Sequence, residues 1–191
     1  MTEDLGDQLR RLHEELGERM RTDWRRDLPF AELVSDRWRR AETLGFGPGA
    51  SIYDSSYVYG DVRVGANTWI GPFTLLDGSG GLSIGEYCSI SAGVHIYTHD
   101  TVAWAVSGGR IPPQRSAVAI GDNTYIGSQV VIARGVTIGD HCVIGAGSFV
   151  NRSIPPYSVA VGSPCRVIGW VEIGPSGDVT LRYAPPAEDS T

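Results

Sequence analysis

The stretch IGDNTYIGSQVVIARGVTIGDHCVIGAGSFV, residues 120–150, indicates the fold class, because an aliphatic residue returns at every sixth position. Neither the 3.6-residue period of a helix nor the two-residue period of a lone strand produces this spacing. A parallel β-solenoid does, because each hexad supplies one short strand and a corner, and three hexads complete a coil of about 18 residues. The aliphatic residues of the series are Ile120, Ile126, Ile132, Ile138, Ile144 and Val150.

The same lattice continues upstream to Ile84 and, after a slip of two residues, from Leu76 back to Ile52. Glycine often follows the aliphatic residue, where we expect it to allow a backbone angle that a Cβ atom would forbid. The fourth position after the aliphatic residue takes a small side chain that faces the interior. Cys88 and Cys142 occupy it, so both are predicted to be core thiols.

Residues 1–46 follow a different pattern. Apolar residues recur there every three or four positions, which predicts two amphipathic helices, the second shorter than the first. The nine arginines and eleven acidic residues of this segment indicate a solvated face, and an Arg-rich nucleic-acid arm is the alternative. Because a solenoid needs caps, we expect this segment to cover one end of a domain at 47–169. A hairpin-like cap and tail at 170–191 is expected to cover the other end.

Composition narrows the function classes. The 191 residues carry a net charge of −6, and all 16 basic residues are arginine, so no uniform basic face for nucleic acid is expected. No apolar run reaches the ~18–20 residues of a membrane span, and the N-terminus MTEDLGDQLRR lacks the apolar core of a secretory signal. Three cysteines without a CxxC pair argue against a disulfide framework or a zinc ribbon. We therefore expect a cytoplasmic protein.

The repeat is interrupted once on a large scale. After Ile96 comes YTHDTVAWAVSGGRIPPQRSAVA, and the lattice resumes at Ile120. We expect residues 97–118 to form a loop that projects from a corner of the solenoid. Long irregular loops on a rigid scaffold often carry function.

Residues 120–168, IGDNTYIGSQVVIARGVTIGDHCVIGAGSFVNRSIPPYSVAVGSPCRVI, resemble the hexapeptide-repeat acyltransferases. The likeness is closest to the galactoside, maltose and nodulation-factor O-acetyltransferases, and it covers roughly residues 50–169. It implies a mainly β fold, a left-handed parallel β-helix, in a homotrimer that uses acetyl-CoA as cosubstrate and no metal. The left hand comes from the resemblance alone, because the general rule for parallel crossovers favours the opposite hand.

His99 is the candidate general base. It lies in IYTHDT at the start of the projecting loop and matches the family's catalytic histidine in order and spacing. A neutral imidazole near pH 7 suits removal of a proton from an attacking hydroxyl. The galactoside-type enzymes usually carry proline next, whereas this chain has Asp100, which could orient the imidazole or be a turn residue. The other histidines are expected at a corner or on the surface: His13, His95 and His141.

The resemblance also suggests acceptor contacts. In the family a carboxylate or amide near Asp77 touches the acceptor sugar, and the alternative for this residue is an Asp-Gly turn. Tyr97 and Trp104 flank His99 and could stack on a sugar face or pack the loop against the solenoid.

Coenzyme contacts follow by motif match. Arg152 and Arg166 correspond to basic residues near the coenzyme phosphates, and the backbone N–H of Ser128 is a candidate oxyanion donor. Arg134 has no assigned role. The resemblance implies sites between neighbouring subunits, with His99 from one chain and Arg152 from the next. The predicted coenzyme-binding set is Tyr125, Ser128, Ala146, Asn151, Arg152 and Arg166.

These expectations favour acetyl-CoA-dependent O-acetylation of a sugar or glycoconjugate. An alternative within the fold is N-acetylation of an amino sugar on a nucleotide. A third reading is a zinc solenoid of the γ-carbonic-anhydrase kind, which needs three converging histidines and has a histidine where this chain has Ser128. A catalytically silent scaffold is the fourth.

Overall fold

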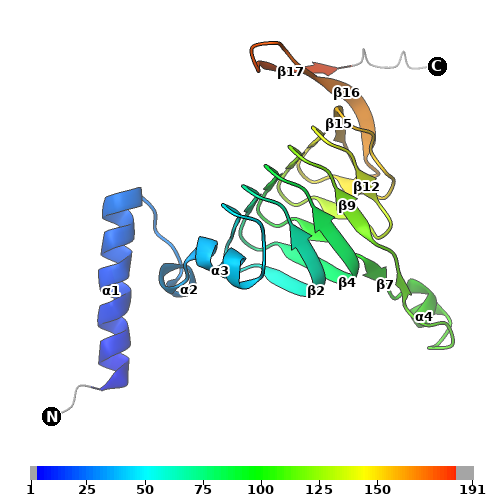
Figure 1. Cartoon of the computed structure of the whole chain (residues 1–191). Coiled ribbons are helices and arrows are strands. Elements are labelled where there is room, and N and C mark those ends of the chain that lie inside the picture. Colours follow the sequence, from blue (N-terminus) through cyan, green and yellow to red (C-terminus); the bar gives the residue numbers. More distant parts are fainter. Residues whose placement is uncertain (1–3, 184–191) are drawn as a thin grey trace, which may run out of the picture.

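The computed structural model of the chain describes residues 4–183. It shows a prism of stacked parallel coils, with helices at the N-terminal end and an antiparallel hairpin at the C-terminal end (Figure 1). One arm that contains a short helix projects from the side of the prism. The fold is therefore the parallel solenoid that the period of six predicts.

Short parallel strands stack into the three faces of the prism. The first face contains β1 (Ser51–Ile52), β3 (Trp69–Ile70), β5 (Ser89–Ile90), β10 (Tyr125–Ile126), β13 (Val143–Ile144) and β15 (Ser158–Val161). The second contains β6 (His95–Ile96), β11 (Val131–Ile132) and β14 (Phe149–Val150), and the third contains β9 (Val118–Ile120) and β12 (Thr137–Ile138). Two longer strands bend from the second face to the third, β2 (Tyr57–Val64) and β4 (Leu75–Ile84).

The interior consists of aliphatic ladders. Ile126 pairs in register with Ile144, and Ile132 pairs with Val150, so residues 18 positions apart stack on each other. These side chains are fully buried. Burial of one isoleucine stabilises the fold by roughly 1.5–3 kcal/mol relative to exposure, which explains why the aliphatic lattice is so regular.

The glycines that follow the aliphatic residues have a different role from the one expected. Gly127 has no positive φ, and a Cβ atom there would lie only 2.5 Å from the backbone nitrogen of Ala146 in the next coil. The left-handed angle falls two residues later, at Gln129, whose φ is 59°. The expectation of a special backbone angle at these glycines was wrong, because close coil-to-coil contact excludes the side chain.

From residue 4 on, three helices precede the prism where two were expected. They are α1 (Leu5–Trp24), α2 (Phe30–Val34) and α3 (Arg37–Thr43). The second predicted helix is divided because the Asp36 carboxylate accepts hydrogen bonds from the backbone N–H groups of Trp38 and Arg39. This N-cap starts a new helix inside the predicted one.

The last of these helices closes the N-terminal end of the prism. Arg40 of α3 donates to the carbonyl oxygens of Tyr53 and Ser56 in the first coil, and Ala41 is buried against the core. By contrast, α1 stands away from the prism and packs against α2 (Figure 1). Its apolar side chains are partly uncovered, and Leu5 is 67% exposed.

The C-terminal end of the prism is covered by antiparallel strands. β16 (Arg166–Ile173) pairs with β15 on one side and with β17 (Val179–Tyr183) on the other. The hairpin thus begins at Arg166, before the start at residue 170 that the sequence predicted. The last residues of the predicted cap and tail, 184–191, lie outside the described residues.

All three cysteines are free and buried, as predicted for Cys88 and Cys142. Burial raises the pKa of each thiol, including that of Cys165, which disfavours a nucleophilic thiolate. Within residues 4–183, none of the helices is both long enough and apolar enough to cross a membrane.

Candidate active site

The projecting arm begins at the corner between the second and third faces, which we call the arm corner. In the arm, β7 (His99–Asp100) pairs antiparallel with β8 (Gln114–Arg115), and α4 (Val102–Val106) lies between them. The backbone N–H of Ser116 donates to the carbonyl oxygen of Thr98 and closes the loop at its base. His99 therefore lies at the root of the arm, against the prism, while α4 projects outward (Figure 1).

His99 is oriented by a carboxylate from another coil. Its Nδ1 atom lies 2.6 Å from Oδ2 of Asp77 and 3.4 Å from the hydroxyl oxygen of Ser79. An ionised carboxylate can only accept, so Nδ1 carries the hydrogen and Nε2 has the free lone pair. The His99 side chain is 38% exposed, so the ring is open to a substrate.

Asp77 is buried, and its carboxylate is surrounded by donors. Oδ2 also accepts from the backbone N–H of Thr98 at 2.8 Å, while Oδ1 accepts from both the backbone N–H and the hydroxyl of Ser79. Burial by itself raises the pKa of Asp77, but the hydrogen bonds from Ser79, Thr98 and His99 outweigh it and hold the pKa well below its usual value. The carboxylate is therefore ionised across the physiological range.

The two-residue slip in the sequence builds this arrangement. Gly60 of β2 pairs with Gly78 of β4, whereas the next pair joins Val62 to Leu82, so β4 holds two additional residues at the arm corner. In this bulge, Ser79 turns back onto Asp77, and Gly80 donates its N–H to the Thr98 hydroxyl at 2.8 Å. The slip was visible in the sequence, but its link to His99 was not.

The Asp77 side chain is buried, so the acceptor contact expected of it is not favoured by its position. Its side chain is only 2% exposed, and both of its oxygens already accept hydrogen bonds from the protein. Asp100 does not orient the imidazole either, because its carboxylate contacts the Arg134 guanidinium and caps the N–H of Val102. Successive residues of a strand point to opposite sides, which separates Asp100 from the ring of His99.

The other histidines lie among aromatic rings. His95 is on the outer side of β6, within a strand and not at the expected corner, and its Nδ1 lies 3.3 Å from the hydroxyl oxygen of Tyr97. His141 stacks on Tyr157 with ring centres 4.8 Å apart, and His13 meets Phe30 edge-on.

The two aromatic residues predicted to contact the acceptor lie in different places. The Tyr97 ring meets the ring of His95 edge-on, which holds Tyr97 to the prism next to the arm. Trp104 lies on α4 in the projecting arm and is 49% exposed. Within one chain, Tyr97 therefore lies on the prism and Trp104 lies on the arm.

The predicted coenzyme residues divide between two corners. Ser128 and Ala146 are exposed at equivalent positions of consecutive coils, at the corner between the first and second faces, where the N–H of Gly147 donates to the Ser128 carbonyl. We call this the Ser128 corner. Tyr125, which is 45% exposed, precedes the Ser128 corner on β10. Arg166 pairs with a residue of β15, and that residue lies against the Ser128 corner.

The remaining two, Asn151 and Arg152, are exposed at the arm corner. The register of Ile132 with Val150 makes Arg134 and Arg152 equivalent in consecutive coils. At about 4.8 Å between coils, Arg152 lies roughly 10 Å along the prism from the coil of His99.

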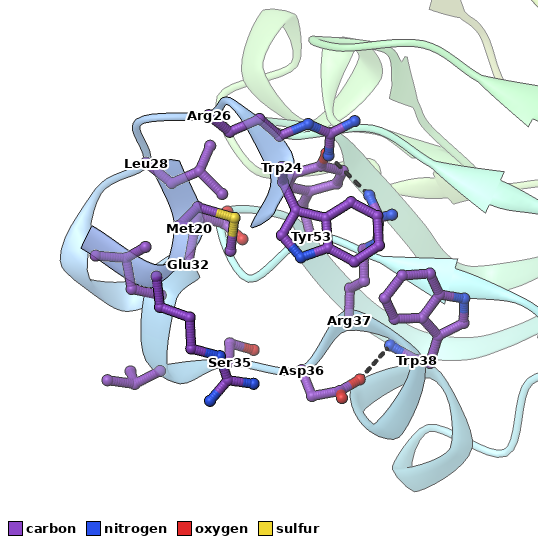
Figure 2. A pocket seen from close by; sticks show the side chains of 13 residues that line it. Met20, Trp24, Arg26, Leu28, Glu32, Ser35, Asp36, Arg37, Trp38 and Tyr53 are labelled. Carbon is purple, nitrogen blue, oxygen red and sulfur yellow. Dashed lines mark hydrogen bonds between the residues drawn. The ribbon is translucent and has the colours of Figure 1, made fainter. Parts of the chain in front are cut away.

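A pocket of about 330 Å³ lies elsewhere, between α1 and the start of α3 (Figure 2). It contains none of the predicted site residues. Several of its polar groups are engaged within the protein: Arg37 donates to the Tyr53 hydroxyl at 3.0 Å and lies over the Trp38 ring, and Glu32 accepts from the N–H of Ser55. These contacts pack the helices against the prism. Among the described side chains, no group of three or more histidine, cysteine, aspartate or glutamate residues could hold a metal ion.

Comparison with known proteins agrees with this architecture. Residues 117–152 match the family model described as bacterial transferase hexapeptide (six repeats). A stretch of 51 residues is 65% identical to the galactoside O-acetyltransferase of Escherichia coli K12, and it covers 27% of this chain and 25% of that enzyme. The curated relative is thus matched over a quarter of its length.

Solved structures match over a larger part of the chain. A hexapeptide-repeat acetyltransferase of Vibrio cholerae is 25% identical with a TM-score of 0.62, covering 86% of this chain and 89% of that one. The same enzyme has been solved with acetyl-coenzyme A. AntD, an N-acyltransferase from Bacillus cereus solved with dTDP and 3-hydroxybutyryl-CoA, is 24% identical with a TM-score of 0.55 over 68% of this chain and 86% of that one, and shares the fold. Residues 117–152 therefore carry the hexapeptide repeat, and the chain has the left-handed β-helix fold of the hexapeptide-repeat acetyltransferases.

Proposed function

We propose that the protein transfers an acetyl group from acetyl-CoA to a hydroxyl group of a sugar or glycoconjugate, with His99 as general base. The observation that carries the proposal is the 2.6 Å contact between Nδ1 of His99 and the buried, ionised carboxylate of Asp77. This contact leaves Nε2 as the basic atom and stabilises the imidazolium that forms during transfer.

In the proposed reaction, Nε2 of His99 takes the proton of the acceptor hydroxyl while the oxygen attacks the thioester carbonyl carbon. The carbon–sulfur bond then breaks, and the imidazolium returns the proton to the leaving thiolate of coenzyme A. The backbone N–H of Ser128 would stabilise the developing oxyanion. Asp77 acts as a positioning residue, since it is buried and contacts the ring at Nδ1.

The coenzyme is proposed to bind along the Ser128 corner. Arg166 and Arg152 are exposed and supply positive charge for its phosphates in an otherwise acidic chain. Because Arg166 and the Ser128 corner lie away from the arm corner that holds His99, we propose a homotrimer in which each site lies between neighbouring prisms. The proposal places the protein in the cytoplasm, where its free thiols would stay reduced.

An amine acceptor is the second candidate, because AntD uses the same fold for N-acyl transfer. A neutral amine attacks a thioester without prior loss of a proton, so a general base contributes less to its transfer. The dependence of the reaction on His99 therefore separates the two acceptor classes.

The test measures free thiol released from acetyl-CoA by the full-length protein with sugars, nucleotide sugars and amino sugars. With a hydroxyl acceptor, His99→Ala should lower kcat by about 10²- to 10⁴-fold, while coenzyme binding is kept. The matched control is His141→Ala, which removes a histidine stacked on Tyr157 away from the arm.

Near wild-type turnover of His99→Ala with a hydroxyl acceptor would refute the assignment of the base. A smaller loss that shrinks as pH rises supports an amine acceptor. If the wild-type protein binds acetyl-CoA and releases no thiol with any acceptor, the scaffold reading replaces the enzyme.

A further inference from the structure

Arg134 joins the two strands at the root of the arm. Its guanidinium group donates to a carboxylate oxygen of Asp100 on β7 and to the side-chain carbonyl oxygen of Gln114 on β8. Asp100 and Gln114 face each other in the β7–β8 register, so one arginine holds both strands of the ribbon. The side chains of Arg134 and Asp100 are 32% and 34% exposed, so water reaches only part of this ion pair.

The arginine comes from the coil that stacks directly on the coil of the arm. The strand before it, β11, pairs in register with β6, the strand that leads into the arm. After Arg134 the chain turns at Gly135, which has a φ of 76° and donates its N–H to the carbonyl oxygen of Ser116 at the other end of the arm. The backbone and the side chain of this corner therefore both contact the base of the arm.

Four charged side chains lie on or next to the β7–β8 pair that contains His99. Asp77 of β4 contacts its ring, Asp100 follows it on β7, Arg115 faces it in the register of β8, and Arg134 contacts Asp100 from the next coil. Asp100 also uses its second oxygen to cap the N–H of Val102 at the start of α4. The positive charge of Arg134 thus compensates the negative charge of Asp100, whereas the carboxylate of Asp77 contacts the imidazole of His99.

We propose that Arg134 is a positioning residue of the candidate active site: it holds the root of the arm to the prism and neutralises Asp100, so that His99 responds to one carboxylate, Asp77. This inference rests on the proposed function only in that His99 is the base. Without Arg134, the uncompensated charge of Asp100 next to His99 favours the imidazolium, which is the form that cannot accept a proton. The guanidinium beside it lowers the pKa of Asp100, which agrees with this compensation.

The inference is tested by following the titration of His99 in the full-length protein by NMR of labelled histidine, with the signal assigned from His99→Ala. In Arg134→Ala, the midpoint of the His99 titration should move to higher pH. In Asp100→Asn, which leaves Arg134 uncompensated, the midpoint should move to lower pH. The double variant Asp100→Asn/Arg134→Ala should return it close to the wild-type value.

Two further variants separate charge from fork geometry. Arg134→Lys keeps the charge but cannot hold Asp100 and Gln114 together, so the midpoint should stay near the wild-type value while the acceptor KM rises. Arg182→Ala removes an exposed ion pair with Glu172 in the C-terminal hairpin and should change neither quantity.

A folded Arg134→Ala protein with an unchanged His99 midpoint overturns the inference, as does a double variant that keeps the full shift of the single one. If Arg134→Ala does not fold, Asp100→Asn and Arg134→Lys test the inference in its place. An unchanged His99 midpoint in Asp100→Asn then overturns the inference. The titration needs no turnover, so a wild-type protein that shows these shifts but transfers no acetyl group refutes the proposed function alone.

Discussion

Nδ1 of His99 and Oδ2 of Asp77 lie 2.6 Å apart although 22 residues separate them in the chain. The contact exists because the two residues belong to neighbouring coils at the arm corner. Thr98, next to His99, donates its N–H to the same carboxylate, which ties the root of the arm to Asp77 through both backbone and side chain. The imidazole is therefore held by the scaffold and does not depend on the outer part of the arm.

Replacing Asp77 with asparagine should lower kcat by about 10²- to 10⁴-fold without removing the base. An amide cannot stabilise the imidazolium as a carboxylate does, and it can hold the ring in the wrong tautomer. Steady-state kinetics with acetyl-CoA and the acceptor identified in the screen measure the loss. The matched control is Asp61→Asn. Asp61 is an exposed aspartate on β2, the strand next to that of Asp77, and it forms an ion pair with Arg63 of the same strand. Equal kinetics of the Asp77 and Asp61 variants would remove Asp77 from the mechanism.

Asp77 should also make the stability of the protein depend on acidity. Its folded-state pKa is lower than the unfolded value of about 3.9, so the ionised carboxylate stabilises the fold above that pH. This contribution is lost as pH falls from about 4 toward the folded-state pKa. The difference in Tm between wild type and Asp77→Asn should be largest near pH 7 and shrink at pH 3. A difference that stays constant from pH 7 to pH 3 would contradict this linkage.

Arg166 and Arg152 are predicted to serve the coenzyme. Replacing either by alanine should raise the KM for acetyl-CoA, since a lost charged contact costs about 1.5–3 kcal/mol, or roughly 10- to 150-fold. The KM for the acceptor should change little. Arg182→Ala is the matched control, because that arginine pairs with Glu172 in the terminal hairpin. A rise in the acceptor KM alone would assign these residues to the acceptor.

Mixed assemblies test whether sites are shared between subunits. His99→Ala and Arg166→Glu chains, each nearly inactive alone, are unfolded and refolded together in equal amounts. If neighbouring prisms supply the two residues, random assembly restores about one half times one half, or roughly a quarter of the sites. Arg152→Glu replaces Arg166→Glu in a second mixture. Arg152 shares the arm corner with His99. If Arg152 and His99 of the same chain act in one site, the mixture that contains Arg152→Glu should show only background activity.

Native mass spectrometry must confirm that mixed trimers form in both experiments. Background activity in the Arg166 mixture, with mixed trimers present, would place each site within a single chain. Recovery toward a quarter in the Arg152 mixture would show instead that Arg152 reaches the His99 of its neighbour, as the family resemblance implies.

The spacing of residues along the chain was enough to predict the solenoid and the position of the arm. Side chains at every sixth residue face the interior of the prism, so the spacing of the isoleucines by itself predicted that they stack in ladders. The interruption after Ile96 placed the arm at one corner for the same reason, because any insertion between strands must leave the prism at a corner. The boundary between α2 and α3 was missed because a single N-cap at Asp36 overrode the apolar period.

The carboxylate that contacts His99 could not be predicted before the coils were seen stacked on each other. Asp100 is its neighbour in the chain, yet consecutive strand residues point to opposite sides, and Asp100 turns to Arg134 instead. Asp77 is 22 positions away, and the stacking of coils, together with the two-residue bulge in β4, brings it within hydrogen-bond distance. Contacts within a strand follow from its period, whereas contacts between coils depend on how many residues each corner holds. That number is known only once the coils are stacked.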